Sequence, residues 1–413
     1  VYPQGYQGER QQPAFNGLLA AYNQGASHSD WFNAYPPRVQ PGDIILVHAG
    51  LYKDTRFRYG SGIGTLFDGT YYLTASGTAE RPIVIRAAGD GPAIFDGDGN
   101  AVLFDVTAAS HTYFEGLTFR NTEVAILAGR KRIIGSEGLT VKRSRFENVG
   151  VGITSDWSGS KNFYIADNVF VGRQIPDHLM GWIGRTWQGF ADFPVPLRSN
   201  AAVKVYGSGH VVAYNDISHF HDGVDHATYG TPDRDAQGRV IRERMPVSID
   251  FEGNDIRGAG DDAVEADYCA HDCRIVGNRV TDCFDAFSSQ PGLGGPTWFV
   301  GNVAYNLAYV AFKLYNGSSG DVLLRNTVVK GGDAFGIYSG APVAHLLTRD
   351  NLLIGGPGGT YDGWSDGVGR VMDAFYVVAR GSSLDYDGLG STTGRFEGKL
   401  ASVRFASLAE LRS

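Results

Sequence analysis

The sequence predicts an all-β protein, a single right-handed parallel β-helix with an N-terminal capping helix and long loop insertions. Three observations favour this solenoid. Asparagines recur at an almost fixed spacing, each begins a short run of β-prone residues, and 57 glycines in 413 residues supply the tight turns of a coiled chain. In such a fold each repeat buries its apolar face only against its neighbours.

The asparagine spacing gives the length of one coil. The recurring residues are Asn168, Asn215, Asn254, Asn278, Asn302, Asn326 and Asn351. From Asn254 onward the steps are 24, 24, 24 and 25 residues, by subtraction of the residue numbers. Short apolar segments separated by Gly, Asn and Asp make the repeat a β-coil rather than a helix pair. Stacking places equivalent residues about 4.8 Å apart, so their chemistry can be followed along columns.

The chain begins with a predicted cap over residues 1–41. Helix formers over 13–25 end in a Gly stop signal, and a helix there would cover the open edge of the first coil. Regular coils follow, beginning near 42–48 and 82–88 and continuing through 113–119 and 141–146.

The C-terminal tail over 380–413 is predicted to be irregular, apart from a short helix over 405–412. The unbroken period makes 1–413 one domain, although its length alone would also suit two or more.

Two gaps between asparagines exceed one coil and predict loop insertions at 173–200 and 228–246. Asn168 to Asn215 is 47 residues, and Asn215 to Asn254 is 39 residues. Long excursions from a rigid scaffold often carry binding residues.

Each insertion holds candidate substrate-binding residues. Trp182 and Trp187 in the first could stack on sugar rings or simply pin the loop to the body. Arg242 and Arg244 in the second suit bidentate capture of a carboxylate or sulfate, or belong to a solvated charged loop.

Composition limits the partners. A formal charge of -8 disfavours nucleic acid, and no apolar run is long enough to insert into a membrane. The chain starts at Val1 without a signal-like stretch, so we expect a secreted or periplasmic protein whose targeting segment has been removed. A local Cys269–Cys273 bridge is one option for the cysteines, but three buried thiols, with Cys283, are favoured.

Registering the coils on the asparagines brings a charged face together. An apolar column is expected from Val224, Val264, Phe287 and Phe312. Because strand side chains alternate, the following residues should all point outward, namely Asp225, Glu265, Ser288 and Lys313. Asp222, Asp262 and Asp285 form a second column at the preceding turn. Further candidate substrate-binding residues in these segments are His221, His226, Asp267 and Tyr315.

Carboxylates packed so densely repel one another unless a cation compensates them. Ca²⁺ takes six to eight oxygens, largely from carboxylates. The candidate ligands are Asp222, Asp225, Asp261, Asp262 and Glu265. A single Asp at a β-helix turn can instead cap backbone N–H groups, and this interpretation is favoured for Asp222 and Asp285 taken alone.

Lys313 is the candidate base. It should lie two coils, on the order of 10 Å, from Glu265, with only small Ser288 between them. A neighbouring cation or desolvation would lower the pKa of its ammonium toward neutrality.

Asp261-Asp262-x-x-Glu265, an Asp on the coil before and Phe312-Lys313-Leu314 resemble polysaccharide lyase family 9. The resemblance implies a parallel β-helix in which these acids bind catalytic Ca²⁺ and Lys313 removes the C5 proton of a uronate. Two features depart from the family pattern: Glu265 stands where an Asp is usual, and the second insertion is not typical. The first coils also look like those of alginate and chondroitin lyases.

The leading prediction is therefore a secreted polysaccharide lyase that acts on an anionic polysaccharide or oligosaccharide with Ca²⁺. A glycoside hydrolase with paired carboxylates is the alternative, since Gly260-Asp261-Asp262 is similar to a polygalacturonase motif. The downstream Gly-His-Gly and Arg-x-Lys of that family are absent. A non-catalytic glycan-binding β-helix is the third interpretation.

Overall fold

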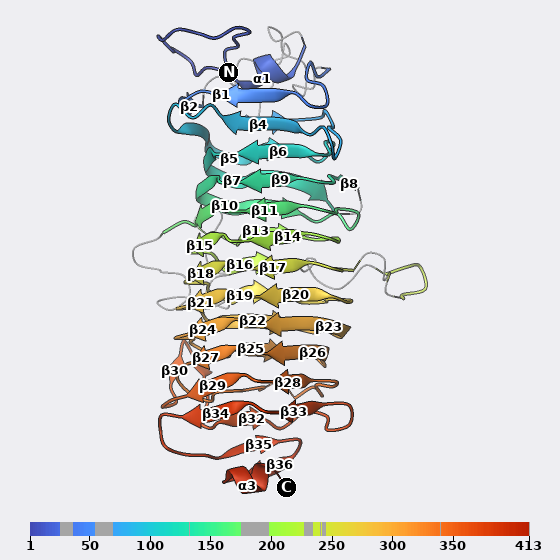
Figure 1. Cartoon of the computed structure of the whole chain (residues 1–413), viewed down its shortest axis with the longest axis vertical. Coiled ribbons are helices and arrows are strands. Elements are labelled where there is room, and N and C mark those ends of the chain that lie inside the picture. The colour runs from blue at the N-terminus through green and yellow to red at the C-terminus, as the bar shows by residue number, and fades with distance from the viewer. Residues whose placement is uncertain are drawn as a thin grey trace. The chain divides into compact units, whose positions relative to one another are not determined.

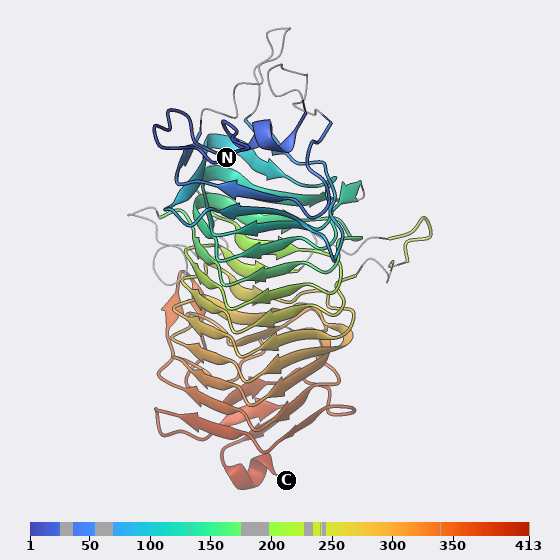
Figure 2. The ribbon, with the colours of Figure 1, turned by 45° about the horizontal axis from the view of Figure 1, so that its top comes forward.

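The computed structural model describes residues 1–24, 36–53, 69–131, 133–174, 198–226, 234–239, 241, 245–338 and 340–412. Its elements are overwhelmingly parallel strands, stacked as rungs within each of two compact units (Figures 1 and 2). Among the described residues, unit 1 comprises Val1–Arg173, 198–205 and His210–Asn215. Unit 2 comprises Gln174, Tyr206–Gly209 and Asp216 onward. The predicted all-β parallel β-helix is confirmed.

Unit 1 has two rows of strands. The first row, in the order of pairing, is β1 (Ile44–Val47), β4 (Ile83–Ala87), β6 (Thr112–Glu115), β9 (Thr140–Lys142), β11 (Tyr164–Ala166) and β14 (Val211–Ala213). The second row contains β2 (Gly50–Tyr52), β3 (Tyr71–Tyr72), β5 (Ala93–Asp105), β7 (Leu117–Arg130), β10 (Arg145–Ser155), β12 (Val169–Val171) and β13 (Ala201–Val205). Short β8 (Ile134–Gly135) pairs antiparallel with β7.

Unit 2 has three main rows. The first is β17 (Asp250–Glu252), β20 (Cys273–Val276), β23 (Leu293–Val300), β26 (Ser319–Leu324), β28 (Leu347–Arg349) and β33 (Ser383–Asp385). The second is β15 (Asp216–Ser218), β18 (Asp255–Arg257), β21 (Arg279–Thr281), β24 (Val303–Tyr305), β27 (Thr327–Val329), β29 (Leu352–Gly355) and β34 (Gly388–Ser391). The third is β16 (Asp222–Asp225), β19 (Asp262–Glu265), β22 (Asp285–Ser289) and β25 (Phe312–Leu314).

Smaller elements complete unit 2. β32 (Met372–Ala374) pairs in parallel with β35 (Gly398–Leu400), which pairs antiparallel with β36 (Val403–Phe405). β30 (Thr360–Tyr361) and β31 (Trp364–Ser365) form a hairpin.

The predicted asparagine column is a buried hydrogen-bond ladder. In unit 2, the backbone N–H and the side-chain amide of Asn278 both donate to Asn302 Oδ1, at 2.9 and 3.1 Å. The same amide donates to the carbonyl of Phe251 at 2.8 Å. Asn302 repeats the pattern with Asn326, so the side chains pair backbone groups that the turns would otherwise leave unsatisfied. The ladder therefore holds each turn in register.

Stacked aromatic rings fill the core beside these ladders. In unit 1 the rings of Phe119 and Phe146 lie 4.9 Å apart, and those of Phe146 and Phe170 lie 4.4 Å apart. In unit 2 the rings of Phe287 and Phe312 stack at 5.5 Å.

Two predicted helices exist but are short. The N-terminal one is α1 (Leu18–Tyr22), within the 13–25 range, and the C-terminal one is α3 (Leu408–Leu411). Residues 380–413, expected to be irregular, also hold β33 to β36. The assignment of 1–413 to one domain, with a cap at 1–41 and insertions at 173–200 and 228–246, stays a prediction.

The favoured interpretation of the cysteines was wrong. Cys269 and Cys273 form a disulfide, and only Cys283 remains a free, buried thiol among the described residues. The turn before β20 brings the two Cα atoms to 6.1 Å, which is within the normal range for a bridge.

Candidate functional site

The candidate site lies on the third row of unit 2, where β16, β19, β22 and β25 follow one another (Figure 1). The predicted register is confirmed in both columns. The apolar column pairs Val224 with Val264, Val264 with Phe287, and Phe287 with Phe312. The charged column pairs Asp225 with Glu265, Glu265 with Ser288, and Ser288 with Lys313.

The charged column is much less exposed than predicted. Asp225 and Ser288 have no exposed surface, and the Lys313 side chain is only 12% exposed. In-register stacking places each side chain between those of adjacent coils, and polar partners then fill the remaining space. Asp267, for example, is buried and accepts hydrogen bonds from the Ser288 hydroxyl at 2.6 Å and from the Gln290 N–H at 2.7 Å.

Lys313 folds back toward the acidic coil. Its Nζ lies 2.6 Å from Asp262 Oδ2 and 3.1 Å from Asp261 Oδ1. The small side chain of Ser288 on the intervening coil leaves room for this reach. Lys313 thus faces the acidic coil as predicted. The residues it contacts there, however, are Asp261 and Asp262 rather than Glu265.

The expected lowering of the Lys313 pKa is contradicted. Burial alone would lower the pKa of this ammonium, but the charges of Asp262 and Asp261, with Asp285 and Asp267, raise it well above its usual value. In this arrangement Lys313 carries a proton and stabilises the acidic coil.

Two carboxylates behind Lys313 are buried and incompletely paired. Asp262 Oδ1 and Asp285 Oδ2 make no hydrogen bond within the described part of the chain. Burial raises the pKa of Asp262 well above its usual value despite the opposing charge of Lys313, and burial raises the pKa of Asp285 to about 7. The other oxygen of Asp285 accepts the Val310 N–H at 2.7 Å, as its predicted turn-capping role requires.

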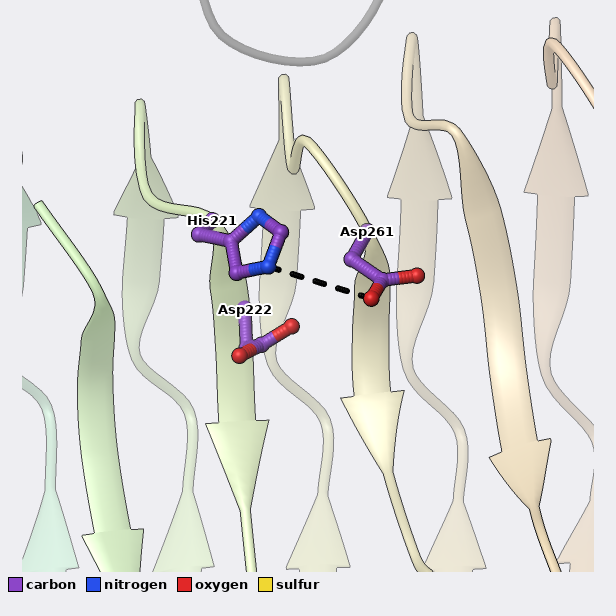
Figure 3. Close-up of side chains that lie close together, drawn as sticks. All are labelled: His221, Asp222 and Asp261. Carbon is purple, nitrogen blue, oxygen red and sulfur yellow. Dashed lines mark ion pairs between the residues drawn. The ribbon is translucent and has the colours of Figure 1, made fainter. Parts of the chain in front are cut away.

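The acids and one histidine group into three triads whose donor atoms lie within 4.8 Å of one another. The triads are His221, Asp222 and Asp261; Asp222, Asp225 and Glu265; and Asp261, Asp262 and Asp285. Figure 3 shows the His221 ring directed at the Asp261 carboxylate, Nε2 to Oδ2 3.8 Å, with Asp222 beside them. All five predicted metal ligands belong to these triads.

The donor set fits a hard cation. Asp222, Asp225 and Glu265 offer carboxylate oxygens only, the ligand type that Ca²⁺ prefers. In the third triad, Asp261 and Asp262 already contact the Lys313 ammonium. The five ligands thus divide between an all-carboxylate group and a group that Lys313 partly neutralises.

Other predicted site residues have different surroundings. His226 is fully buried, with its ring 5.5 Å from that of Phe251, so it lines the core rather than a surface. The Tyr315 hydroxyl donates to Tyr309 at 3.0 Å. Trp182, Trp187, Arg242 and Arg244 lie outside the described residues.

Sequence reasoning missed an aromatic cluster beside the acids. Phe284 directly precedes Asp285, and Tyr309 directly precedes Val310, whose N–H donates to Asp285. The two rings stack at 5.4 Å. Trp364, from β31, packs on Phe284 at 6.0 Å and on Tyr309 at 5.2 Å, and Tyr338 lies 5.6 Å from Tyr309. The coil period could have placed Tyr338 on the coil that follows the one carrying Lys313, but the hairpin of Trp364 interrupts the period.

No known family model matches the sequence, and no match was found among curated proteins. The helices of the described chain include none with the length and apolar character needed to cross a bilayer.

Several solved structures have a similar chain path. The catalytic unit of a GH87 α-1,3-glucanase from Streptomyces thermodiastaticus strain HF3-3 is 12% identical, with TM-score 0.43, over 84% of this chain and 64% of that one. PfbA, a surface adhesin of Streptococcus pneumoniae, is 13% identical, with TM-score 0.43, over 82% and 85%. The pectate lyase Pel9A is 16% identical, with TM-score 0.35, over 88% and 76%. Likenesses this distant do not choose among a hydrolase, an adhesin and a lyase.

Proposed function

We propose that the protein is a polysaccharide lyase that cleaves a uronate-containing glycan by Ca²⁺-assisted β-elimination. The observation that carries the proposal is a cluster of largely buried carboxylates that Lys313 reaches past the small side chain of Ser288. An all-carboxylate triad beside a lysine provides both a cation site and a proton acceptor on one face. Secretion and membership of lyase family 9 stay predictions.

In the proposed reaction the acids and Lys313 have separate roles. Asp222, Asp225 and Glu265 hold the cation, with Asp261 at the edge of the site. Bound Ca²⁺ would neutralise the uronate carboxylate and stabilise the negative charge that develops on it as the C5 proton leaves. Lys313 accepts that proton only as the neutral amine, so when substrate binds its contacts with Asp261 and Asp262 must loosen and its own proton must pass to solvent.

A glycoside hydrolase is the second candidate, because one observation favours it directly. Burial raises the pKa of Asp262 and of Asp285, while Asp261, in the same triad, is more exposed. Hydrolases cleave a glycosidic bond with two neighbouring carboxyl groups, one of which is kept protonated by its surroundings.

The reaction products separate these candidates. We expect pectate or alginate, incubated with the protein and Ca²⁺, to yield a 4,5-unsaturated uronate that absorbs in the ultraviolet. Lys313→Ala should abolish this product. Lys313→Arg should abolish it too, because a guanidinium keeps the positive charge beside Asp261 and Asp262 but stays protonated.

Stability must be measured alongside, since removing one member of a buried ion pair leaves the other charge uncompensated. Lys313→Arg is therefore the decisive variant, and Lys161→Ala, an exposed lysine paired with Glu137, is the matched control that should stay active. Saturated products that persist in Lys313→Arg and vanish in Asp262→Asn would refute the lyase and favour the hydrolase.

A further inference from the structure

A cavity of about 320 Å³ lies in unit 2 beyond the coil that carries Lys313. Its lining includes three aromatic side chains and two cations: Tyr338, Phe375, Tyr376, Lys399 and Arg404. Apart from Tyr338, which belongs to the aromatic cluster beside the acids, these residues take no part in the site described above.

The cavity lies on the coils that follow the one carrying Lys313. Val303 pairs with Thr327, so the coil that holds Tyr338 directly follows the coil that holds Lys313. Gly336 pairs in parallel with Asp373, so Phe375 is equivalent to Tyr338 on the next coil. Phe375 thus lies two coils after the one that carries Lys313, on the order of 10 Å along the stack.

The aromatic cluster links the two places physically. Tyr338 lies 5.6 Å from Tyr309 between ring centroids, and Tyr309 accepts the hydroxyl hydrogen bond of Tyr315, two residues after Lys313. A continuous run of aromatic side chains therefore leads from the acidic site to the cavity.

The aromatic rings of the cavity are open to a ligand. Phe375 is 37% exposed and Tyr376 is 43% exposed, and their rings meet edge to face at 5.2 Å. Perpendicular rings present two apolar walls, which suit the C–H faces of a sugar. The partly buried Tyr338 forms the side nearest the site.

The charge of the cavity is positive in a protein whose formal charge is -8. Lys399 Nζ and Arg370 Nη1 share one carboxylate oxygen, Asp373 Oδ2, at 3.0 and 3.1 Å. Arg404, the cross-strand neighbour of Lys399, makes no ion pair or side-chain hydrogen bond to any described residue.

The acids near Arg404 are engaged elsewhere. Glu397 and Glu410 line an adjoining hollow with it. Glu397 lies 3.9 Å from Arg395 Nη1, and Glu410 accepts the Ala406 N–H at 2.7 Å. An exposed guanidinium beside aromatic walls is suited to a carboxylate or sulfate on a sugar.

We propose that this cavity is a distal subsite for an acidic glycan. The subsite holds an anionic sugar several sugar units away from the bond that is cleaved. Tyr376 and Phe375 pack on the sugar ring, and Arg404 binds its anionic group with support from Lys399. The proposal rests on the proposed function for the position of the cleaved bond. The proposed subsite predicts that the protein prefers long, charged glycan chains as substrates.

The test compares oligouronates of increasing length, from the dimer to the octamer, at low salt. We expect Arg404→Gln to lower kcat/KM about tenfold for the longest substrates through KM, with the shortest cleaved substrate unaffected. Tyr376→Ala should also lower kcat/KM for the longest substrates. Arg86→Gln is the control, because Arg86 is an exposed strand arginine of unit 1 and the charge change is identical. Equal kinetics for Arg404→Gln and Arg86→Gln at every length would overturn the subsite, as would an equal loss at every length.

Binding to chelator-treated protein separates this proposal from the lyase. Calorimetry with a hexauronate should show affinity that falls about tenfold in Arg404→Gln, and a neutral hexasaccharide should bind more weakly. If wild type binds in this way but yields no unsaturated product, the subsite stands and the lyase fails. If wild type cleaves but Arg404→Gln binds as wild type does, the subsite fails and the lyase stands.

Discussion

At the residue scale, burial decides the chemistry of the acids in unit 2. Asp321 is a clear case away from the candidate site. It has no exposed surface, and Oδ2 accepts the Ser318 hydroxyl at 2.6 Å, while Oδ1 makes no hydrogen bond within the described chain. Burial raises its pKa to about 6, although the hydroxyls of Ser318 and Ser289 act against the shift. The folded state therefore favours the protonated carboxyl.

Asp321→Asn should make the folded state less sensitive to pH. Because the folded pKa lies above the unfolded value of about 3.9, wild type loses stability as the pH rises from about 4 to 6. The loss is roughly 3 kcal/mol and is complete above that window. An amide does not titrate, so the variant should gain this amount over wild type between pH 4 and pH 7.

Urea unfolding at both pH values measures the difference. An Asn side chain at position 321 keeps the shape of Asp321. Its amide can donate to the hydroxyl of Thr297, the register partner, which makes no hydrogen bond to described residues. A constant difference between variant and wild type from pH 4 to pH 7 would contradict a raised pKa.

At the element scale, the turns of unit 2 depend on the asparagine ladder. Asn302 is fully buried, and its Oδ1 accepts from both the N–H and the amide of Asn278. Its own amide donates to the Ile275 carbonyl at 2.8 Å and to Asn326 Oδ1 at 3.0 Å. The hydrogen bonds of each turn are therefore completed by the asparagine of the next coil.

Asn302→Ala should lower the free energy of unfolding by about 3 kcal/mol, because several buried donors and acceptors lose their partners at once. The control is Asp387→Asn at the end of the ladder. Asp387 Oδ1 accepts from the N–H and the amide of Asn351, and an Asn keeps that acceptor. Chemical denaturation should show Asp387→Asn near wild type. A loss in Asp387→Asn as large as that in Asn302→Ala would mean that the ladder depends on the Asp387 charge as well as on the amide pattern.

The period of the ladder also explains what the sequence could predict. The register of Asp225, Glu265, Ser288 and Lys313 was predicted correctly, because each coil is anchored at its asparagine and the turn needed a slip of only one residue. The direction of the Lys313 side chain could not be predicted from the period, because a long flexible side chain turns toward the nearest opposite charges that it can reach. The Cys269–Cys273 bridge depends on the shape of one turn, so the sequence offered it only as the less favoured option. The hairpin of Trp364 departs from the period and was not predicted.

At the scale of the whole molecule, the acidic cluster belongs to unit 2 alone. In a solenoid each coil contacts only its neighbours, so a ligand stabilises the coils that hold it and the effect decays along the stack. The cation proposed at Asp222, Asp225 and Glu265 should therefore act locally. Binding to the folded state adds stability by mass action, in proportion to the logarithm of the free concentration.

We expect Ca²⁺ at millimolar concentration to slow amide hydrogen exchange in β16, β19, β22 and β25, and to leave the phenylalanine-stacked strands of unit 1 unchanged. Local opening of the acidic coils should become rarer, because the repelling carboxylates are neutralised only in the folded state. Glu265→Gln removes a ligand charge with little change of shape and should weaken the protection. Asp385→Asn, an exposed acid of β33 outside the triads, should respond as wild type does. Protection that spreads equally over both units, or that survives in Glu265→Gln, would place the ion elsewhere and leave the buried acids to be balanced by protons and Lys313 alone.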